Sequence, residues 1–228
     1  MGMKQHKPFV PTGSPDDRAR DFYEMMSQRR TVRDYCDKPV PEELIRTLIA
    51  TAGTAPSGAN KQPWRFVAVQ DPELKRQIRI AAEVEEREFY AKRASPEYLQ
   101  DLAPLGTTHE KSYMEVVPWL VVVFKLMKDP TPNVELGSSS QVYYVNESVG
   151  IAIGMFLAAA QNAGLSTLTH TPSPMSFLRK VLRRPEYERP YLIIAVGHPS
   201  ENCHVPDISR KPIDEVMVID RPESSNDD

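Results

Sequence analysis

Hydrophobic positions recur along this chain at two spacings, one typical of helices and one typical of strands. Helical spacing between capping residues predicts helices over residues 14–28, 41–52, 71–90, 148–163 and 175–182. Alternating or short apolar runs predict strands over residues 64–69, 119–124, 165–171 and 191–196. The helix at 148–163 is apolar nearly all round, which predicts a buried position. Strands separated by helices indicate an α+β or α/β protein, and the pattern does not choose between them.

The two ends of the chain differ from the middle. Residues 1–13 and 221–228 are polar and are predicted to be disordered tails, so that residues 14–220 form one predicted domain. Three apolar residues near its end have no obvious place in a compact monomer: Val216, Val218 and Ile219. We therefore expect the C-terminal arm, residues 203–220, to wrap around a second subunit.

Composition and charge exclude several classes of protein. The 228 residues carry a net charge of −3, which argues against a nucleic-acid binder because no basic stripe could neutralise phosphates along a duplex. No apolar run reaches the ~20 residues that a membrane helix needs, and we expect a cytoplasmic protein. Cys36 and Cys203 lack the spacing of a disulfide framework or a zinc site. They are expected to be buried thiols, although a bond between them stays open, and no metal is expected.

Two short segments carry residues suited to a ligand. Arg29, Arg30, Thr31 and Arg33 place three guanidinium groups and a hydroxyl within five residues, which suits a phosphate group. Alone, this cluster is better interpreted as the solvated end of a helix. Residues 56–64 form a turn whose glycine and prolines bring backbone amides close to a flat ligand, and such turns also occur in many unrelated proteins.

Together and in this order, the two segments resemble the FMN site of the nitroreductase superfamily. The resemblance implies an α+β, nitroreductase-like fold: a central mixed β-sheet flanked by helices, in an intertwined homodimer with exchanged C-terminal arms. It implies that FMN is held by Arg29, Arg30, Thr31, Val32, Arg33, Pro56 and Ser57. The first two arginines would hold the phosphate, and Arg33 would face the pyrimidine edge, where charge accumulates on reduction. Arg210 resembles the family's second phosphate-binding arginine.

Four further segments make the stretch from Arg29 to Val218 similar to the iodotyrosine deiodinases in particular: residues 51–59, 143–147, 161–165 and 205–212. This closer resemblance implies reductive dehalogenation of mono- and diiodotyrosine, in one-electron steps, to tyrosine and iodide. It leaves the electron donor open between NAD(P)H and a reductase.

Three residues carry the expected recognition of an amino acid. Glu86 and Tyr90 lie four residues apart, on one face of a predicted helix, and Lys111 follows a segment with prolines and a glycine. Without the FMN segments, this charged stretch would be interpreted as a solvated helix face. The resemblance implies instead a substrate lid over residues 86–111, in which Glu86 meets the ammonium, Lys111 the carboxylate, and Tyr90 adds its hydroxyl. It also implies that the backbone amide of Ala59 binds the phenolate oxygen.

Thr169, His170 and Thr171 end a predicted strand just before Pro172. The resemblance implies that all three lie at the flavin. It makes Thr171 the catalytic residue, whose hydroxyl hydrogen-bonds flavin N5 and favours one-electron steps over hydride transfer. His170 departs from the family pattern, which often has a hydroxyl residue here, and a lone histidine is most often a packed residue.

Two other functions remain open. A general FMN-dependent nitroreductase or quinone reductase using NAD(P)H would transfer hydride and would need no amino-acid site, so Glu86, Tyr90 and Lys111 separate it from a deiodinase. A non-catalytic protein could bind halogenated aromatics or store flavin, and steady-state turnover would exclude it.

Overall fold

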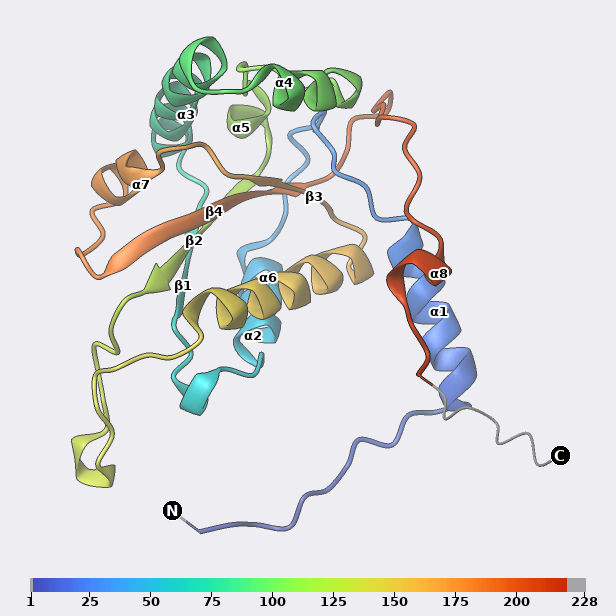
Figure 1. The fold of residues 1–228 in the computed structure, drawn as a ribbon, viewed down its shortest axis with the longest axis vertical. Helices are drawn as coiled ribbons and strands as arrows, with labels where there is room; N and C mark the ends of the chain where they lie inside the picture. Colours follow the sequence, from blue (N-terminus) through green and yellow to red (C-terminus); the bar gives the residue numbers. More distant parts are fainter. Residues whose placement is uncertain (1, 221–228) are drawn as a thin grey trace, which may run out of the picture.

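The computed structural model describes residues 2–220, in which helices cover both faces of one β-sheet (Figure 1). The strands are β1 (Trp64–Val69), β2 (Trp119–Leu126), β3 (Ser166–His170) and β4 (Glu188–Gly197). The α-helices of this range are α1 (Pro15–Ser27), α2 (Glu42–Gly53), α3 (Pro72–Lys92), α4 (Pro96–Leu102), α5 (Tyr113–Val116), α6 (Val145–Asn162), α7 (Ser176–Val181) and α8 (Ile213–Val216). The arrangement confirms the α+β class.

The four strands pair in the order β1-β2-β4-β3, and every pair is antiparallel. The expected mixed sheet is therefore wrong for these strands. The connection through α3, α4 and α5 returns the chain to the end of β1, where Val69 pairs with Leu120, so that β2 must run back along β1. Within residues 2–220, the one parallel pairing is an isolated bridge between Thr31 and Thr167.

Strand β2 lies at the centre of the core and is buried on both faces, as its unbroken apolar sequence predicts. Leu120 and Val122 point into one hydrophobic cluster, whereas Val121 and Val123 point into another. The first cluster includes residues of α3, α5 and α7, and the second includes residues of α2 and α6. Phe156 of α6 is fully buried, whereas Ile151 of the same helix is 47% exposed, so in the described chain the predicted burial of this helix holds for one face only.

Most predicted element boundaries agree with the structure to within a few residues. Helix α1 begins at Pro15, and the Ser14 hydroxyl accepts a hydrogen bond from the backbone N–H of Asp17 at 3.1 Å. Helices α4 and α5 were not predicted, because both are too short to show a hydrophobic period. The start of α4 nevertheless carries a signal, since the Ser95 hydroxyl accepts from the amide of Tyr98 at 3.2 Å.

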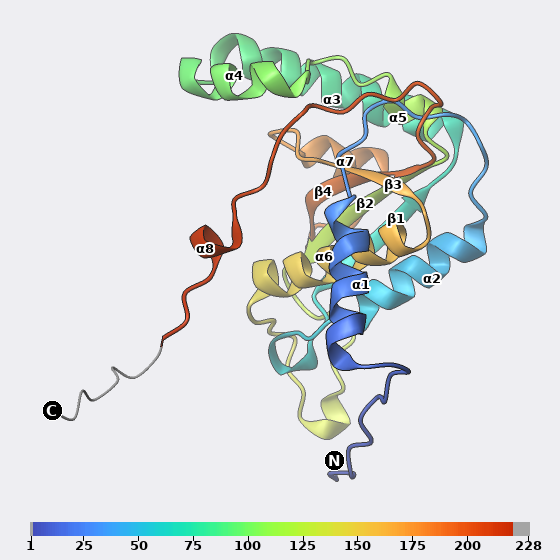
Figure 2. The same ribbon diagram turned by 90° about the vertical axis from the view of Figure 1, so that its right-hand side faces the viewer.

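Both ends of the described chain extend from its body (Figures 1 and 2). Residues 2–13 form no helix or strand and are almost entirely exposed, while the predicted tail 221–228 lies outside the described residues. The C-terminal arm crosses the end of α1 and then runs away from the sheet (Figure 2). Val218 is 93% exposed, so this end of the arm has no apolar partner within residues 2–220.

Candidate functional site

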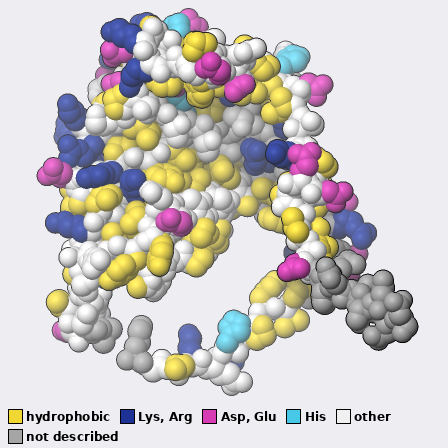
Figure 3. All heavy atoms as spheres, in the orientation of Figure 1, with side chains coloured by type: hydrophobic (Ala, Val, Ile, Leu, Met, Phe, Trp, Pro, Cys, Tyr) yellow, Lys and Arg dark blue, Asp and Glu magenta, His cyan; other side chains and the backbone are white. Residues whose placement is uncertain are grey.

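The arginine cluster lies where the segment after α1 meets the C-terminal arm. A cavity of about 180 Å³ there is lined by Arg29, Arg30, Thr31, Arg33 and Arg210 together with Leu105, Pro206, Ile208 and Ser209. The structure thus brings together the four predicted phosphate-binding and flavin-binding arginines, although Arg210 stands 177 positions after Arg33 in the sequence. Dark blue basic side chains are visible in this region, between the body and the arm (Figure 3).

Backbone contacts hold the two segments against each other. Arg210 donates to the carbonyl oxygens of Ser27, at 3.2 Å, and of Arg29, at 2.8 Å. Arg30 in turn donates to the carbonyl oxygen of Pro206. The side chain of Val32 is buried in the core, and its backbone N–H donates to the carbonyl oxygen of Thr167 at 3.3 Å. Val32 therefore fixes the position of its arginine neighbours rather than lining the cavity.

The electrostatics of this cavity favour an anion. Burial, followed by the charges of Arg210 and Arg30, lowers the pKa of Arg29. Within the described residues, none of the four arginines forms an ion pair with a carboxylate. Clustered cations without counterions repel one another, and a phosphate group would relieve that repulsion while accepting several charge-assisted hydrogen bonds.

A second cavity of about 230 Å³ adjoins the first and shares Arg33 with it. Its walls also include Lys111, Thr169 and His170, three further residues that the sequence places at the site. The segment 106–113 provides one wall and the end of β3 the other. The predicted lid and the predicted end of the strand are thus brought together beside the arginine cluster.

Lys111, which lines this second cavity, forms an ion pair with Glu86. Lys111 Nζ lies 2.7 Å from Glu86 Oε2, and the side chains are only 3% and 12% exposed, respectively. Lys111 Nζ also donates to the carbonyl oxygen of Thr108, and its backbone N–H donates to Glu83 Oε1 at 2.8 Å. The lid therefore presents one buried charge of each sign within a few ångströms.

The hydrogen bonding of the pair is incomplete. Although Glu86 Oε2 is close to the ammonium, no donor meets it with hydrogen-bond geometry. Burial, and then the charge of Glu86, raises the pKa of Tyr90 to about 12, so its hydroxyl keeps its proton at neutral pH. A bound group with its own donors could complete what the protein leaves unpaired.

His170 is buried behind the pair and is uncharged. Burial, followed by the charges of Lys111 and Arg33, lowers its pKa to about 3. His170 Nδ1 lies 3.6 Å from Glu86 Oε1, while Nε2 has no hydrogen-bond partner in the described residues. The contact with Glu86 alone would favour the charged form, but desolvation and two cations outweigh it.

The alternation of β3 places its neighbours on the opposite face. Thr169 and Thr171 are both exposed, whereas His170 is buried. Thr169 lines the second cavity, and Thr171 follows the last residue of the strand. The Thr171 hydroxyl neither donates nor accepts a hydrogen bond within the described chain.

The turn at residues 56–62 is not brought to this site. It lies beside the start of α6, where a Cβ added to Gly58 would come within 2.9 Å of both Tyr143 O and Tyr144 Cδ2. In both ribbon views the cyan turn lies near the bottom of the body, whereas the blue segment after α1 lies near the top (Figures 1 and 2). Pro56, Ser57 and Ala59 therefore stand apart from the arginine cluster of their own chain.

The same turn has an unusual backbone. Ala59, Asn60 and Gln62 have φ values of 50°, 54° and 46°, in the left-handed region that costs a non-glycine residue about 1 kcal/mol. The N–H groups of residues 60, 61 and 62 donate within the turn, and that of Gly58 donates to Ser148 Oγ. The N–H of Ala59 has no acceptor in the described chain and lies at the exposed surface.

Among the residues at or beside the site that sequence reasoning missed, three make specific contacts. Tyr113 lines the second cavity and is buried against Tyr35, with ring centroids 6.3 Å apart. Glu83 anchors Lys111, and its helical spacing of three residues from Glu86 was an available signal. Arg93 donates to the carbonyl oxygen of Ser173 at 2.6 Å, a contact that no local sequence pattern predicts.

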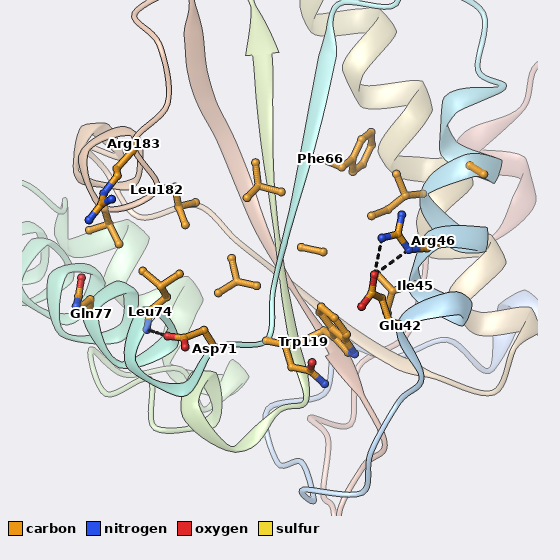
Figure 4. Close-up of a pocket in the computed structure, with 17 residues that line it drawn as sticks. Glu42, Ile45, Arg46, Phe66, Asp71, Leu74, Gln77, Trp119, Leu182 and Arg183 are labelled. Carbon is orange, nitrogen blue, oxygen red and sulfur yellow. Dashed lines mark hydrogen bonds and ion pairs between the residues drawn. The ribbon is translucent and has the colours of Figure 1, made fainter.

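A larger cavity, of about 1120 Å³, contains none of the predicted site residues. It is a groove along β1, bounded by α2 on one side and by α3 and α7 on the other, with Ile45, Phe66 and Leu74 among its apolar residues (Figure 4). β1 is an edge strand of the sheet, and its outer edge pairs with no other strand of the described chain.

Three sequence expectations concern groups outside these cavities. Both cysteines are free and only half-buried, so full burial is wrong. In residues 2–220, no group of three His, Cys, Asp or Glu side chains is arranged to hold a metal ion. None of the helices described has the length and apolar character needed to cross a bilayer.

Comparison with known proteins agrees with this geometry. Residues 26–198 match the nitroreductase family. The chain is 49% identical to the iodotyrosine deiodinase of Haliscomenobacter hydrossis over 224 residues, which span 95% of this chain and 100% of that protein. It is 42% identical to human iodotyrosine deiodinase 1 over 220 residues, 94% of this chain and 75% of the human protein.

Solved structures give the same result. A crystal structure of oxidised iodotyrosine deiodinase bound to FMN and 3-iodo-L-tyrosine superposes with a TM-score of 0.73 at 30% identity, over 89% of this chain and 99% of that one. A nitroreductase with bound FMN from Bacteroides fragilis has a TM-score of 0.62 at 20% identity, over 88% and 99% of the two chains, which shows a shared fold. The chain therefore belongs to the nitroreductase family. Within that family it is similar to iodotyrosine deiodinases along almost its whole length.

Proposed function

We propose that this protein is an FMN-dependent enzyme that reductively removes iodide from iodotyrosine. The observation that carries the proposal is the buried Glu86–Lys111 pair. It lies at the second cavity, which shares Arg33 with the cavity lined by four arginines without counterions. A free amino acid offers an ammonium and a carboxylate, and the pair offers the opposite charges. A general nitroreductase would have no use for such a pair.

The arginine cavity fits the phosphate end of FMN. A phosphate monoester carries close to two negative charges at neutral pH and three strong acceptor oxygens. Arg29, Arg30 and Arg210 would hold it, and Arg33, which lines both cavities, would face the pyrimidine edge of the flavin. The depressed pKa of Arg29 supports this assignment, because the cluster gains stability from an added anion.

The lid would bind the amino-acid end of the substrate. Glu86 takes the ammonium, Lys111 takes the carboxylate, and the Tyr90 hydroxyl, still protonated, donates a hydrogen bond. In this chain Lys111 and Glu86 neutralise each other, so binding exchanges one ion pair for two. Since both side chains are buried, that exchange keeps every charge paired in a site of low dielectric.

Bound FMN, once reduced by NAD(P)H or by a reductase, supplies the two electrons that replace the carbon–iodine bond by a carbon–hydrogen bond. The balanced reaction consumes iodotyrosine, two electrons and one proton, and releases tyrosine and iodide. The free hydroxyl of Thr171 is available to hydrogen-bond flavin N5. The free amide of Ala59 is available to bind the phenolate oxygen, and closure of residues 86–111 would exclude water.

The proposed active unit is a homodimer. The turn at residues 56–62 lies far from the arginine segment of its own chain (Figures 1 and 2), which supports a site that a second copy completes. Hydrophobic side chains also gather on the surface over α6, among them Ile151, which is 47% exposed (Figure 3). The unpaired edge of β1 opens onto the apolar groove of Figure 4, which suits the exposed C-terminal arm of the partner. A cytoplasmic location stays a prediction.

Titration of the FMN-loaded protein with 3-iodotyrosine, followed by flavin fluorescence, tests this proposal. 2-Iodophenol, which lacks the zwitterion, is the matched ligand. We expect strong quenching by iodotyrosine and little by the phenol, and loss of the difference in Glu86→Gln and Lys111→Ala. Equal quenching by the two ligands would favour the general nitroreductase. Quenching by iodotyrosine without iodide release from the reduced protein would favour a flavin-storing protein.

A further inference from the structure

The recognition of the amino acid and the expected chemistry involve different parts of the chain. Glu86 and Tyr90 are on α3, whereas Thr171 follows β3, and no hydrogen bond of the described chain reaches its hydroxyl. For the amino acid to influence the reaction, some contact must join these two parts. Two contacts do so, and they lie on either side of Thr171.

The first contact lies immediately before Thr171. His170 Nδ1 is 3.6 Å from Glu86 Oε1, and both side chains are buried. Because His170 is uncharged, it can approach the carboxylate as a neutral N–H donor without competing with an ammonium for the role of counterion. A movement of the Glu86 carboxylate toward a ligand would therefore directly change its contact with His170.

The second contact lies two residues after Thr171. Arg93 Nη2 donates to the carbonyl oxygen of Ser173 at 2.6 Å. The guanidinium is held in place from its own helix end, since it lies 5.5 Å from the centroid of the Phe89 ring and 3.7 Å from Glu85 Oε2. Arg93 is thus an organised side chain that ties the end of α3 to the segment of Thr171.

Helical spacing connects the two contacts to the amino-acid site. Glu86 and Tyr90 lie four residues apart on one face of α3, and Arg93, three residues further on, is the C-cap of the same helix. A shift of this helix end when the lid closes would act on residues 170–173 at both points together. Thr171, between them, would have little freedom to move independently.

We propose that Arg93 is a positioning residue that, together with the Glu86–His170 contact, fixes the segment of Thr171 when an amino acid occupies the lid. This inference rests on the proposed function and deepens it: Arg93 lines neither the arginine cavity nor the second cavity, and it acts through the Ser173 carbonyl. It makes the arrangement at Thr171 depend on whether the lid is closed. A ligand without an amino-acid group would fail to produce that arrangement.

The test compares Arg93→Gln with Lys92→Gln in the FMN-loaded protein. Lys92 is the adjacent residue and the last of α3, and within the described chain its side chain pairs only with exposed Glu88. Hydrogen exchange would be measured with and without 3-iodotyrosine over residues 86–111 and 168–175. In the unaltered protein and in Lys92→Gln, we expect protection of both segments. In Arg93→Gln, we expect protection of the lid alone.

Kinetics supply the second readout. We expect Arg93→Gln to lower kcat for iodide release about tenfold or more, while the Kd for iodotyrosine rises less than threefold. Arg93→Lys, which keeps the charge, should recover part of kcat. Protection of residues 168–175 in Arg93→Gln, or equal losses in kcat and affinity, would overturn the inference. Failure of the unaltered protein to release iodide would instead contradict the proposed function.

Discussion

The buried Glu86–Lys111 pair makes a quantitative prediction about stability. In Lys111→Met, a residue of similar length replaces the ammonium, and the Glu86 carboxylate loses its partner, 2.7 Å away, in a site where it is 12% exposed. Removing one member of a buried ion pair typically costs 3–5 kcal/mol, because the remaining charge stays desolvated. We expect a loss of about 3 kcal/mol, at the lower end, since His170 lies near the same carboxylate.

Urea unfolding at fixed protein and FMN concentration would measure this loss. With a slope of roughly 3 kcal/mol per molar urea, the midpoint should fall by about 1 M. The double variant Glu86→Gln/Lys111→Met removes both charges and should recover most of the lost stability, which gives a large coupling energy. Each single variant is expected to weaken iodotyrosine binding, and so is the double variant.

Lys92→Met is the matched control. Lys92 lies on the same helix as Glu86 and forms an ion pair of 3.1 Å with Glu88, but these two side chains are 70% and 51% exposed. Exposed pairs contribute about 0–1 kcal/mol, so the control should shift the midpoint little. The reasoning is refuted if Lys111→Met costs no more than Lys92→Met, or if the double variant is less stable than Lys111→Met.

Three further predictions concern the cofactor, pH and the dimer. Arg210→Gln should weaken FMN binding to the apoprotein about ten- to a hundredfold in a fluorescence titration, because a hydrogen bond between charged groups contributes about 1.5–3 kcal/mol; Lys211→Gln, whose side chain pairs only with Glu215, should change it less than twofold, and equal effects would argue against the assignment. His170 takes up a proton at a pKa of about 3 when folded and about 6.5 when unfolded, so its stabilising contribution is complete above pH 6.5 and is lost as the pH falls through this range, by about 1.4 kcal/mol per unit. Urea unfolding at several pH values should show a smaller acid loss in His170→Asn, and identical pH profiles would contradict the neutral buried imidazole. A chain ending after Pro212 keeps Arg210 but lacks the exposed apolar end of the arm, and sedimentation should show a weaker dimer; an unchanged dimer would exclude arm exchange.

Much of the fold could be predicted from the sequence because most of its helices and strands carry local sequence signals. Strand β2 is an unbroken apolar run, and α1 and α3 begin with capping residues followed by proline. The strand directions could not be predicted in this way. They depend on where a connection of some fifty residues returns the chain, which is a property of tertiary packing.

The candidate site likewise has residues that the sequence predicts and residues that it does not. The neighbouring arginines, and Glu86 with Tyr90, are visible as short spacings, and resemblance to a family extended them to Arg210 and Lys111. The contact of Arg93 with Ser173 spans 80 residues and leaves no local trace. The turn at residues 56–62 lies apart from the arginine segment of its own chain, so neither a local pattern nor a contact within the described chain links Ala59 to the site, and only the resemblance does.

The most direct test of the proposed function is anaerobic product analysis. The FMN-loaded protein would be reduced with dithionite, freed of excess reductant, and mixed with excess 3-iodotyrosine. One reduced FMN carries two electrons, so we predict one iodide and one tyrosine per FMN, and 2-iodophenol should yield almost none. Reoxidation without iodide, or equal iodide release from the phenol, would contradict a deiodinase that recognises the amino acid through Glu86 and Lys111.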